Sequence, residues 1–270
     1  MKKFDIYKIA ITLLFTAICA SAIKVSPAVF TARNVPLGKM VPLGLELKVY
    51  NDSDDTMSYT LEVVKPANGV TLLEGYSPIA SKDFFVVEGG ESSLAVPPKS
   101  VASRMMFSNI PEKDEFYNQM WAVSVVVTGG SGMFKTAVAT KYYIETPSRE
   151  TKSPPFGEVA TMPSAVHFQK DENRATFKLL NNGNEPKSFV IEPFVPDAAS
   201  DRVTIDATQG WRFSAAFADS IECVPASVDV EAGGSREIEV ELKGDFGKAE
   251  ALLRIETKDG GSKVVRVFSE

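Results

Sequence analysis

Few residues of this chain have side chains that could do chemistry. His167 is the only histidine among 270 residues, and Cys223 is the only cysteine outside the first 22. A nucleophilic mechanism of the Ser-His-Asp or Cys-His type needs an imidazole beside a nucleophile and a carboxylate that orients it, and nothing in the spacing around His167 indicates either. One histidine and one cysteine are also too few for the usual tetrahedral zinc site. We therefore expect no catalytic residue, no metal ion and no cofactor.

Two other segments could hold a ligand but are better explained as turns. Asn51–Asp55 gathers the oxygen ligands that calcium prefers, but it lacks the glycine and the distal glutamate of an EF-hand loop. Asn, Asp and Ser favour turns because they bond to their own backbone, so a solvated turn is expected. Gly129–Gly132 has no Lys-Ser/Thr pair and precedes a strand, which predicts a hairpin loop and not a phosphate-binding loop.

Phe116, Tyr117 and Trp121 are the candidate binding residues, and they stand beside an acidic run at 112–115. A glycosidase needs two carboxylates about 5–10 Å apart across a cleft, whereas neighbours in one turn share one environment. The aromatic rings could form a platform for a sugar. The structural alternative has Tyr117 bonding back to the backbone as a tyrosine corner, with Trp121 filling the space between two sheets.

The N-terminus has the features of a secretory signal. Lys2, Lys3 and Lys8 precede the apolar run Ile9–Ile18, and Ala20-Ser21-Ala22 is a small-x-small cleavage site. Because a membrane-spanning helix needs about 20 apolar residues, we expect cleavage after Ala22 and no stable membrane insertion afterwards. The mature chain is then periplasmic or extracellular, and its one thiol, Cys223, is either buried in a strand or available to another chain.

Charge excludes one class of partner. The whole chain carries a formal net charge of −6, and removal of the leader, which carries +2, leaves −8. A negative surface repels the phosphate backbone and anionic lipid. We therefore expect no nucleic acid among the partners.

Alternation of apolar and polar residues with period two dominates the chain after the leader, which is typical of half-buried antiparallel strands. Leu43 to Tyr50 is the first clear case, and Ile238 to Lys243 is the plainest strand with one wet face. Further strands are expected at 59–63, 84–87, 101–107, 121–127, 136–144, 174–181, 187–191, 251–255 and 264–268.

A polar segment with three prolines divides these strands into two series. Residues 148–157 include Pro154 and Pro155 and follow Pro147, so they are expected to form a linker. About seven short strands on each side of it favour two sandwiches over one closed barrel. The sequence thus predicts an all-β protein with two immunoglobulin-like antiparallel β-sandwich domains in tandem, at 23–147 and 158–270, after a signal peptide at 1–22.

Two passages carry a resemblance to known families. Ile110-Pro111-Glu112, followed by Phe116 to Trp121 and a Val-rich strand, resembles the extracellular immunoglobulin-like domain of WxL-interacting bacterial cell-surface proteins. Leu180 to Asn184, Pro225 to Val228 and Ala232 to Ser235 are similar to turns of many bacterial immunoglobulin-like repeats. The resemblance implies a non-catalytic protein of the bacterial envelope that binds another envelope protein or a glycan polymer.

An exported chain of two sandwiches also looks like a periplasmic pilus chaperone, whose partner is completed by the addition of a strand at an open sheet edge. That resemblance implies a pair of basic anchors, for which Arg33 and Lys141 are the positional candidates. We therefore expect a non-catalytic binding or scaffolding protein that uses sheet edges or loops. The alternative is a chaperone for exported subunits that acts by β-strand addition, with an angle and a cationic pair between its domains.

Overall fold

The computed structural model describes residues 23–67, 70–90, 93–130, 135–196, 202–205, 212–258 and 260–270, and at 202–205 it describes the backbone alone. The predicted leader lies outside these ranges, as does part of the predicted hairpin loop at Gly129–Gly132. Within the described ranges, no helix is both long and apolar enough to cross a bilayer.

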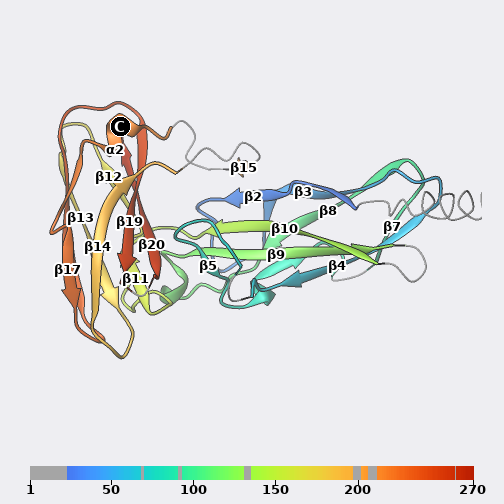
Figure 1. The fold of residues 1–270 in the computed structure, drawn as a ribbon, viewed down its shortest axis with the longest axis horizontal. Coiled ribbons are helices and arrows are strands. Elements are labelled where there is room, and N and C mark those ends of the chain that lie inside the picture. The colour runs from blue at the N-terminus through green and yellow to red at the C-terminus, as the bar shows by residue number, and fades with distance from the viewer. Residues whose placement is uncertain are drawn as a thin grey trace, which may run out of the picture.

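Two facing sheets form the N-terminal sandwich (Figure 1). The first has the order β1-β3-β8-β6, and the second has the order β15-β2-β10-β9-β4-β7, with β5 paired to β9. Their strands are β1 (Lys24–Ser26), β2 (Val29–Ala32), β3 (Val41–Asn51), β4 (Met57–Val64), β5 (Ser77–Pro78), β6 (Phe85–Val87), β7 (Ser93–Val96), β8 (Ser100–Ser108), β9 (Met120–Gly129), β10 (Thr136–Glu145) and β15 (Arg202–Ile205). Two short 3₁₀ helices, η1 (Lys82–Phe84) and η2 (Asp114–Phe116), precede β6 and β9.

Two further sheets form the C-terminal sandwich, in the orders β11-β13-β18-β16 and β12-β20-β19-β14-β17. Their strands are β11 (Val159–Met162), β12 (Ala165–Phe168), β13 (Arg174–Asn181), β14 (Lys187–Phe194), β16 (Ile221–Val224), β17 (Ser227–Val230), β18 (Ser235–Leu242), β19 (Ala249–Thr257) and β20 (Ser262–Ser269), with the short helix α2 (Ala215–Ala218) before β16. The fold class is therefore confirmed, although β2, β5, β12 and β15 pair in parallel.

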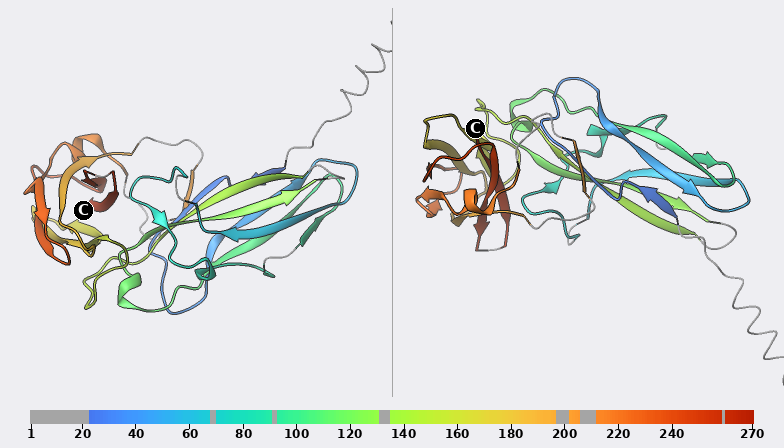
Figure 2. Two further views of the ribbon diagram at one scale, coloured as in Figure 1. Left: turned by 60° about the horizontal axis from the view of Figure 1, so that its bottom comes forward. Right: turned by 90° about the horizontal axis from the view of Figure 1, so that it is seen from above.

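The sandwiches do not lie end to end. The strands of the C-terminal sandwich stand across the end of the N-terminal sandwich, and the further views show the same arrangement (Figures 1 and 2). The predicted linker at 148–157 contains no strand in the structure. The predicted domain boundaries stay a prediction.

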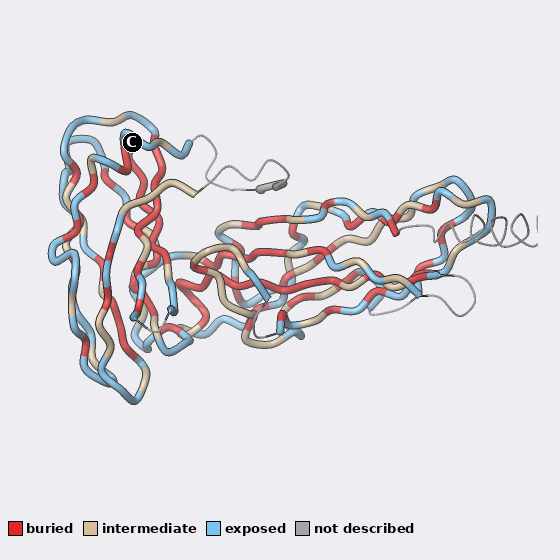
Figure 3. The backbone as a smooth tube through the Cα atoms, in the orientation of Figure 1, coloured by how far each residue is buried: buried red, intermediate tan, exposed pale blue. Residues whose placement is uncertain are grey.

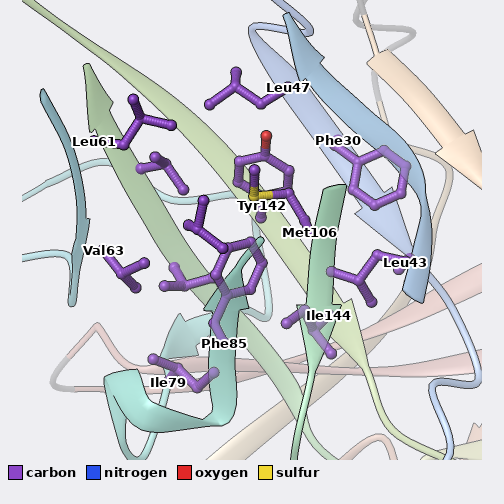
Figure 4. Close-up of a cluster of buried hydrophobic side chains, with 14 of the residues drawn as sticks. Phe30, Leu43, Leu47, Leu61, Val63, Ile79, Phe85, Met106, Tyr142 and Ile144 are labelled. Carbon is purple, nitrogen blue, oxygen red and sulfur yellow. The ribbon is translucent and has the colours of Figure 1, made fainter. Parts of the chain in front are cut away.

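Alternation explains the cores. Buried residues recur along most strands, and exposed residues lie mostly at strand ends and in connections (Figure 3). In the N-terminal sandwich, apolar side chains from both sheets meet between them, among them Leu47, Leu61, Phe85 and Tyr142 (Figure 4). The C-terminal sandwich has its own core, which includes Phe177, Phe189 and the buried Cys223.

The cluster at Asn51–Asp55 is a turn held by a buried side chain. The Asn51 amide nitrogen donates to the carbonyls of Asp55 at 2.7 Å and of Val96 at 2.9 Å. Its amide oxygen accepts the backbone N–H of Ser53 at 3.0 Å. Since the asparagine oxygen is engaged with the turn itself, the turn interpretation accounts for these residues without an ion.

Candidate functional site

The predicted binding residues lie inside the protein near the meeting point of the sandwiches. Trp121 is fully buried, and its ring centroid lies 5.7 Å from that of Phe116 and 6.4 Å from that of Phe156. Tyr117 is buried as well, and its hydroxyl donates to the Glu112 carboxylate at 3.4 Å instead of to the backbone. The rings therefore form an aromatic cluster and not an open platform, and a binding role for them stays a prediction.

The acidic run helps to dock the predicted linker. The Asp114 carboxylate accepts the Lys152 backbone N–H at 2.9 Å and pairs with the Arg149 guanidinium at 3.1 Å. The backbone hydrogen bond from Lys152 is the largest influence that lowers the pKa of Asp114. The Asn118 amide adds a reciprocal pair of bonds with the backbone of Arg149. Arg149 and Lys152 are therefore bound to the N-terminal sandwich, whereas Thr151 between them donates to the Met162 sulfur on β11 of the C-terminal sandwich.

Four charged side chains, three buried and Arg33 partly buried, meet where the two sandwiches touch, and we call them the junction cluster: Arg33, Glu145, Glu250 and Arg266. Arg33 follows β2 and Glu145 ends β10, while Glu250 and Arg266 lie on β19 and β20. Arg266 donates through Nε to Glu145 Oε2 at 2.6 Å and also pairs with Glu250. Arg33 lies 3.1 Å from Glu250 and 3.7 Å from Glu145. Each carboxylate thus contacts one arginine from each sandwich.

The junction cluster is neutral in sum and internally matched. Burial alone raises the pKa of Glu145, but the charge and hydrogen bonds of Arg266 outweigh it and hold that pKa below its usual value. The Tyr76 hydroxyl also donates to Glu145, and burial, followed by that carboxylate, raises the pKa of Tyr76 well above its ordinary range. Each of the four charged side chains thus has a partner of opposite sign within the cluster.

A cavity of about 240 Å³ borders this cluster, lined by Arg33, Glu145, Arg266, Gln119 and His167 among others. The volume lies below the range of roughly 300–1,000 Å³ that ligand pockets usually have. The His167 ring stacks on Phe268 with centroids 4.7 Å apart, and burial lowers the pKa of His167. The arginines that face the cavity already contact carboxylates, so the cavity presents no excess of positive charge.

The structure does not bring the two positional anchors together. Arg33 belongs to the junction cluster, whereas Lys141 donates through Nζ to the Thr71 carbonyl at 2.9 Å. The cation beside Arg33 is Arg266, which the sequence analysis missed. A signal existed, because Arg266 interrupts the apolar run Val264–Phe268, and a charge inside a buried strand needs a partner.

Other contacts bind the sandwiches together beside the junction cluster. Arg254 on β19 forms a two-point ion pair with Glu74 from the connection that follows β4. Gly75, next to it, has φ +80° and lies so close to Val264 that an added Cβ would fall 2.4 Å from a methyl carbon. A side chain at this position would push the sandwiches apart.

An open sheet edge lies on β10, away from this junction. All ten residues of β10 pair with β9, but β2 pairs only with Lys141–Ile144. On that side, Thr136–Thr140, which we call the outer half of β10, pairs with no strand of the described chain. Lys141 N–H donates toward β2, to the Ala28 carbonyl at 3.0 Å. Because backbone groups alternate in direction along a strand, Ala139 and Ala137 present theirs on the same, open side, and both residues are exposed.

Comparisons with known proteins give a likeness of fold at low similarity. No protein-family model and no curated protein matches the chain. The Escherichia coli chaperone DraB is 15% identical, with 92% of this chain and 96% of that chain covered and a TM-score of 0.32. A Porphyromonas gingivalis W83 protein of unknown function is 12% identical (92% and 99% covered, TM-score 0.36). The Pseudomonas aeruginosa CupB2 chaperone is 13% identical (92% and 100% covered, TM-score 0.29). TM-scores this low carry no inference about function, and the resemblance to WxL-interacting proteins stays a prediction.

Proposed function

We propose that this chain is a non-catalytic exported protein that binds another envelope protein by β-strand addition at the outer half of β10. The observation that carries the proposal is the open edge itself, where Ala137 and Ala139 offer N–H and C=O groups to an incoming strand. Such an edge is a template for pairing with another chain. A partner segment of about five residues would match its length.

The side chains of this edge permit close approach by a strand. Edges that must not pair are usually protected by proline, inward-pointing charge or a bulge. Thr136–Thr140 contains neither a proline nor a charged residue, and its register with β9 is unbroken. Lys135, directly before it, is exposed. The edge therefore suits an uncharged, β-branched segment whose start or end carries an acidic residue.

A protein partner is better supported than a glycan polymer. The aromatic rings that a sugar would stack on are buried in the aromatic cluster, and the cavity at the junction is small with matched charges. Strand addition needs only backbone groups and small side chains, which the outer half of β10 supplies.

A chaperone for exported subunits is the narrower form of this proposal. Its requirement for sandwiches set across each other agrees with the arrangement in Figure 1. It also requires a cationic pair between the sandwiches. The cations found there are Arg33 and Arg266, not the predicted Arg33 and Lys141, and both are paired with carboxylates. A chaperone would engage its subunit through the same edge, so the experiment below tests both forms.

The test uses a labelled peptide of alternating threonine and valine, seven residues long, as a surrogate strand. We expect saturable binding that slows amide hydrogen exchange at Ala137 and Ala139. Ala137→Pro with Ala139→Pro removes both edge N–H groups and should weaken binding at least tenfold. The matched control, Ala137→Ser with Ala139→Ser, keeps the N–H groups and should bind like the wild type. Equal binding by the proline and serine variants would overturn the proposal.

A photo-crosslinker at position 139 then separates the two forms in the native envelope. A crosslinked partner that folds only in the presence of this chain identifies a chaperone. A partner that is stably folded by itself identifies a scaffolding or adhesive role. A crosslinker on β4, two strands away in the same sheet, at exposed Glu62, is the control and should not capture the same protein.

A further inference from the structure

A strand from the C-terminal half of the chain completes a sheet of the N-terminal sandwich. β15 pairs in parallel with β2 over its full length of four residues, from Arg202 opposite Val29 to Ile205 opposite Ala32. β2 therefore has a strand on each side, β10 and β15. Without β15, the outer edge of β2 would be a row of unpaired N–H and C=O groups, directly beside the open half of β10.

The connection that carries β15 is long and is fixed at both ends. It leaves β14 at Phe194 and ends at α2, which begins at Ala215. Loops longer than about 12–15 residues are uncommon in compact folds and are often functional. At its end, Glu250 N–H donates to the Arg212 carbonyl at 2.9 Å, and the Ser214 N–H donates to the Glu250 carbonyl at 3.1 Å. The chain thus leaves its own sandwich, pairs with β2, and returns beside the junction cluster.

The equivalent connection of the N-terminal sandwich makes the reverse crossing. Between β4 and η1, the chain carries Glu74 and Gly75 to β19 and β20 of the C-terminal sandwich, and β5 then rejoins β9. In each sandwich, the connection that follows β4 or its equivalent β14 therefore contacts the other sandwich. The N-terminal connection contributes an ion pair and close packing, whereas the C-terminal one contributes a strand.

We infer that β15 is a capping strand, supplied by the chain itself, that closes the outer edge of β2 against strands of other molecules. Unprotected edges associate with other chains, and proteins cover them with an additional element where association would be harmful. A capped β2 leaves the outer half of β10 as the place on this side of the sheet where a partner strand can add. Only this last consequence rests on the proposed function.

A disulfide tests the register directly. Val29→Cys with Arg202→Cys puts two thiols directly opposite each other on adjacent strands, about 5 Å apart at Cα. Ala32→Cys with Arg202→Cys is the control. Position 32 lies about 10 Å further along β2 than position 29, which puts the two thiols too far apart for a disulfide. Under mild oxidation the first pair should close within one chain, at least tenfold faster than the second. Equal rates for the two pairs would overturn the inference.

A second variant tests the capping role. Val203→Pro with Thr204→Pro removes the β2-facing N–H, whichever of the two it is, because successive N–H groups point to opposite sides of a strand. Amide exchange at Val29 and Thr31, whose N–H groups point away from β10 and toward β15, should become at least tenfold faster, and sedimentation should show concentration-dependent self-association. Val203→Thr with Thr204→Val keeps both N–H groups and should behave like the wild type. Unchanged exchange and a monomeric proline variant would overturn the capping role.

These results are separable from those of the peptide experiment. If the peptide does not bind but the Val29→Cys, Arg202→Cys variant forms its disulfide, strand addition at β10 is contradicted and the capping role of β15 is still supported. Peptide binding at Ala137 and Ala139 without the register-specific disulfide has the opposite meaning.

Discussion

The two sandwiches share one frame. Their sheets have the same strand order, with β1, β3, β8 and β6 matching β11, β13, β18 and β16. The parallel strands β2 and β12 match as well, because Lys141 N–H donates to the Ala28 carbonyl and Arg266 N–H donates to the Ser164 carbonyl at the same point of each ladder. Asn51 has its counterpart in Asn181, whose amide nitrogen donates to the carbonyls of Glu185 and Val230. Apart from β15 and β5, which the N-terminal sandwich has in addition, the difference between the sandwiches therefore lies in a few side chains.

Those few side chains decide which end of each sandwich is covered. Where β5 joins β9 the N-terminal sandwich has the small, buried Ala122, and at the matching bridge the C-terminal sandwich has Glu250 of the junction cluster. In the C-terminal sandwich, the first half of the last strand, β20, contacts the N-terminal sandwich, because Val264 packs on Gly75. The equivalent half of β10 is open. The same strand order thus gives an interface at the last strand of the C-terminal sandwich and an open edge at the last strand of the N-terminal sandwich.

The largest effect is expected at Glu145, whose counterpart in the C-terminal sandwich is Glu270. Glu145 follows Lys141 by four residues, as Glu270 follows the equivalent Arg266, but Glu270 is exposed. Glu145→Ala leaves Arg266 buried without its main partner and should lower the free energy of unfolding by about 3–5 kcal/mol. Glu270→Ala should change it by less than about 0.5 kcal/mol. Urea unfolding measures both, and similar small losses would show that the junction cluster does not hold the sandwiches.

The next largest loss of stability is expected for the buried turn asparagines, and it should be equal in the two sandwiches. Asn51→Ala and Asn181→Ala each leave buried carbonyls without a donor, which costs about 1–3 kcal/mol. Differential scanning calorimetry should show similar losses for both variants. Asn184→Ala, on the exposed side of the second turn, is the control and should be near neutral. A large loss for one asparagine alone would contradict their equivalence.

Acid should weaken the junction through Glu145. Because the native pKa of Glu145 is held below its usual value, its stabilising effect is complete above the unfolded pKa of about 4.3 and is lost as pH falls through the native pKa. The melting temperature of the wild type should therefore fall more steeply between pH 5 and pH 3 than that of Glu145→Gln. Parallel curves for the two proteins would contradict the assignment.

The smallest effect concerns a core position where the sandwiches differ in residue type. Cys223 pairs with Val240 as Val87 pairs with Met106 in the other sandwich. Cys223→Val should therefore change the free energy of unfolding by less than about 1.5 kcal/mol. Burial raises the pKa of the Cys223 thiol to about 12, so iodoacetamide at pH 8 should label the wild type only after unfolding. Rapid labelling of the folded protein would show that this thiol is accessible.

The long strands could be predicted from the sequence, and the short ones could not. Ile238, Val240 and Leu242 alternate with glutamates, and they lie inward on β18 as expected. β2, β11 and β12 have three or four residues inside mixed segments, too few to show a period of two. These short strands could therefore not be predicted, nor could the fact that β2 covers only part of β10.

The sequence by itself determined the all-β class and the division of the strands into two sandwiches, because alternation and turn residues act over a few neighbouring positions. Only the tertiary structure decided the junction cluster and the open edge. Glu145 and Arg266 are 121 positions apart, and the neighbour of each strand is set by pairings across the whole chain. A charge shows its need for a partner in the sequence, but the partner's identity depends on how the sandwiches meet.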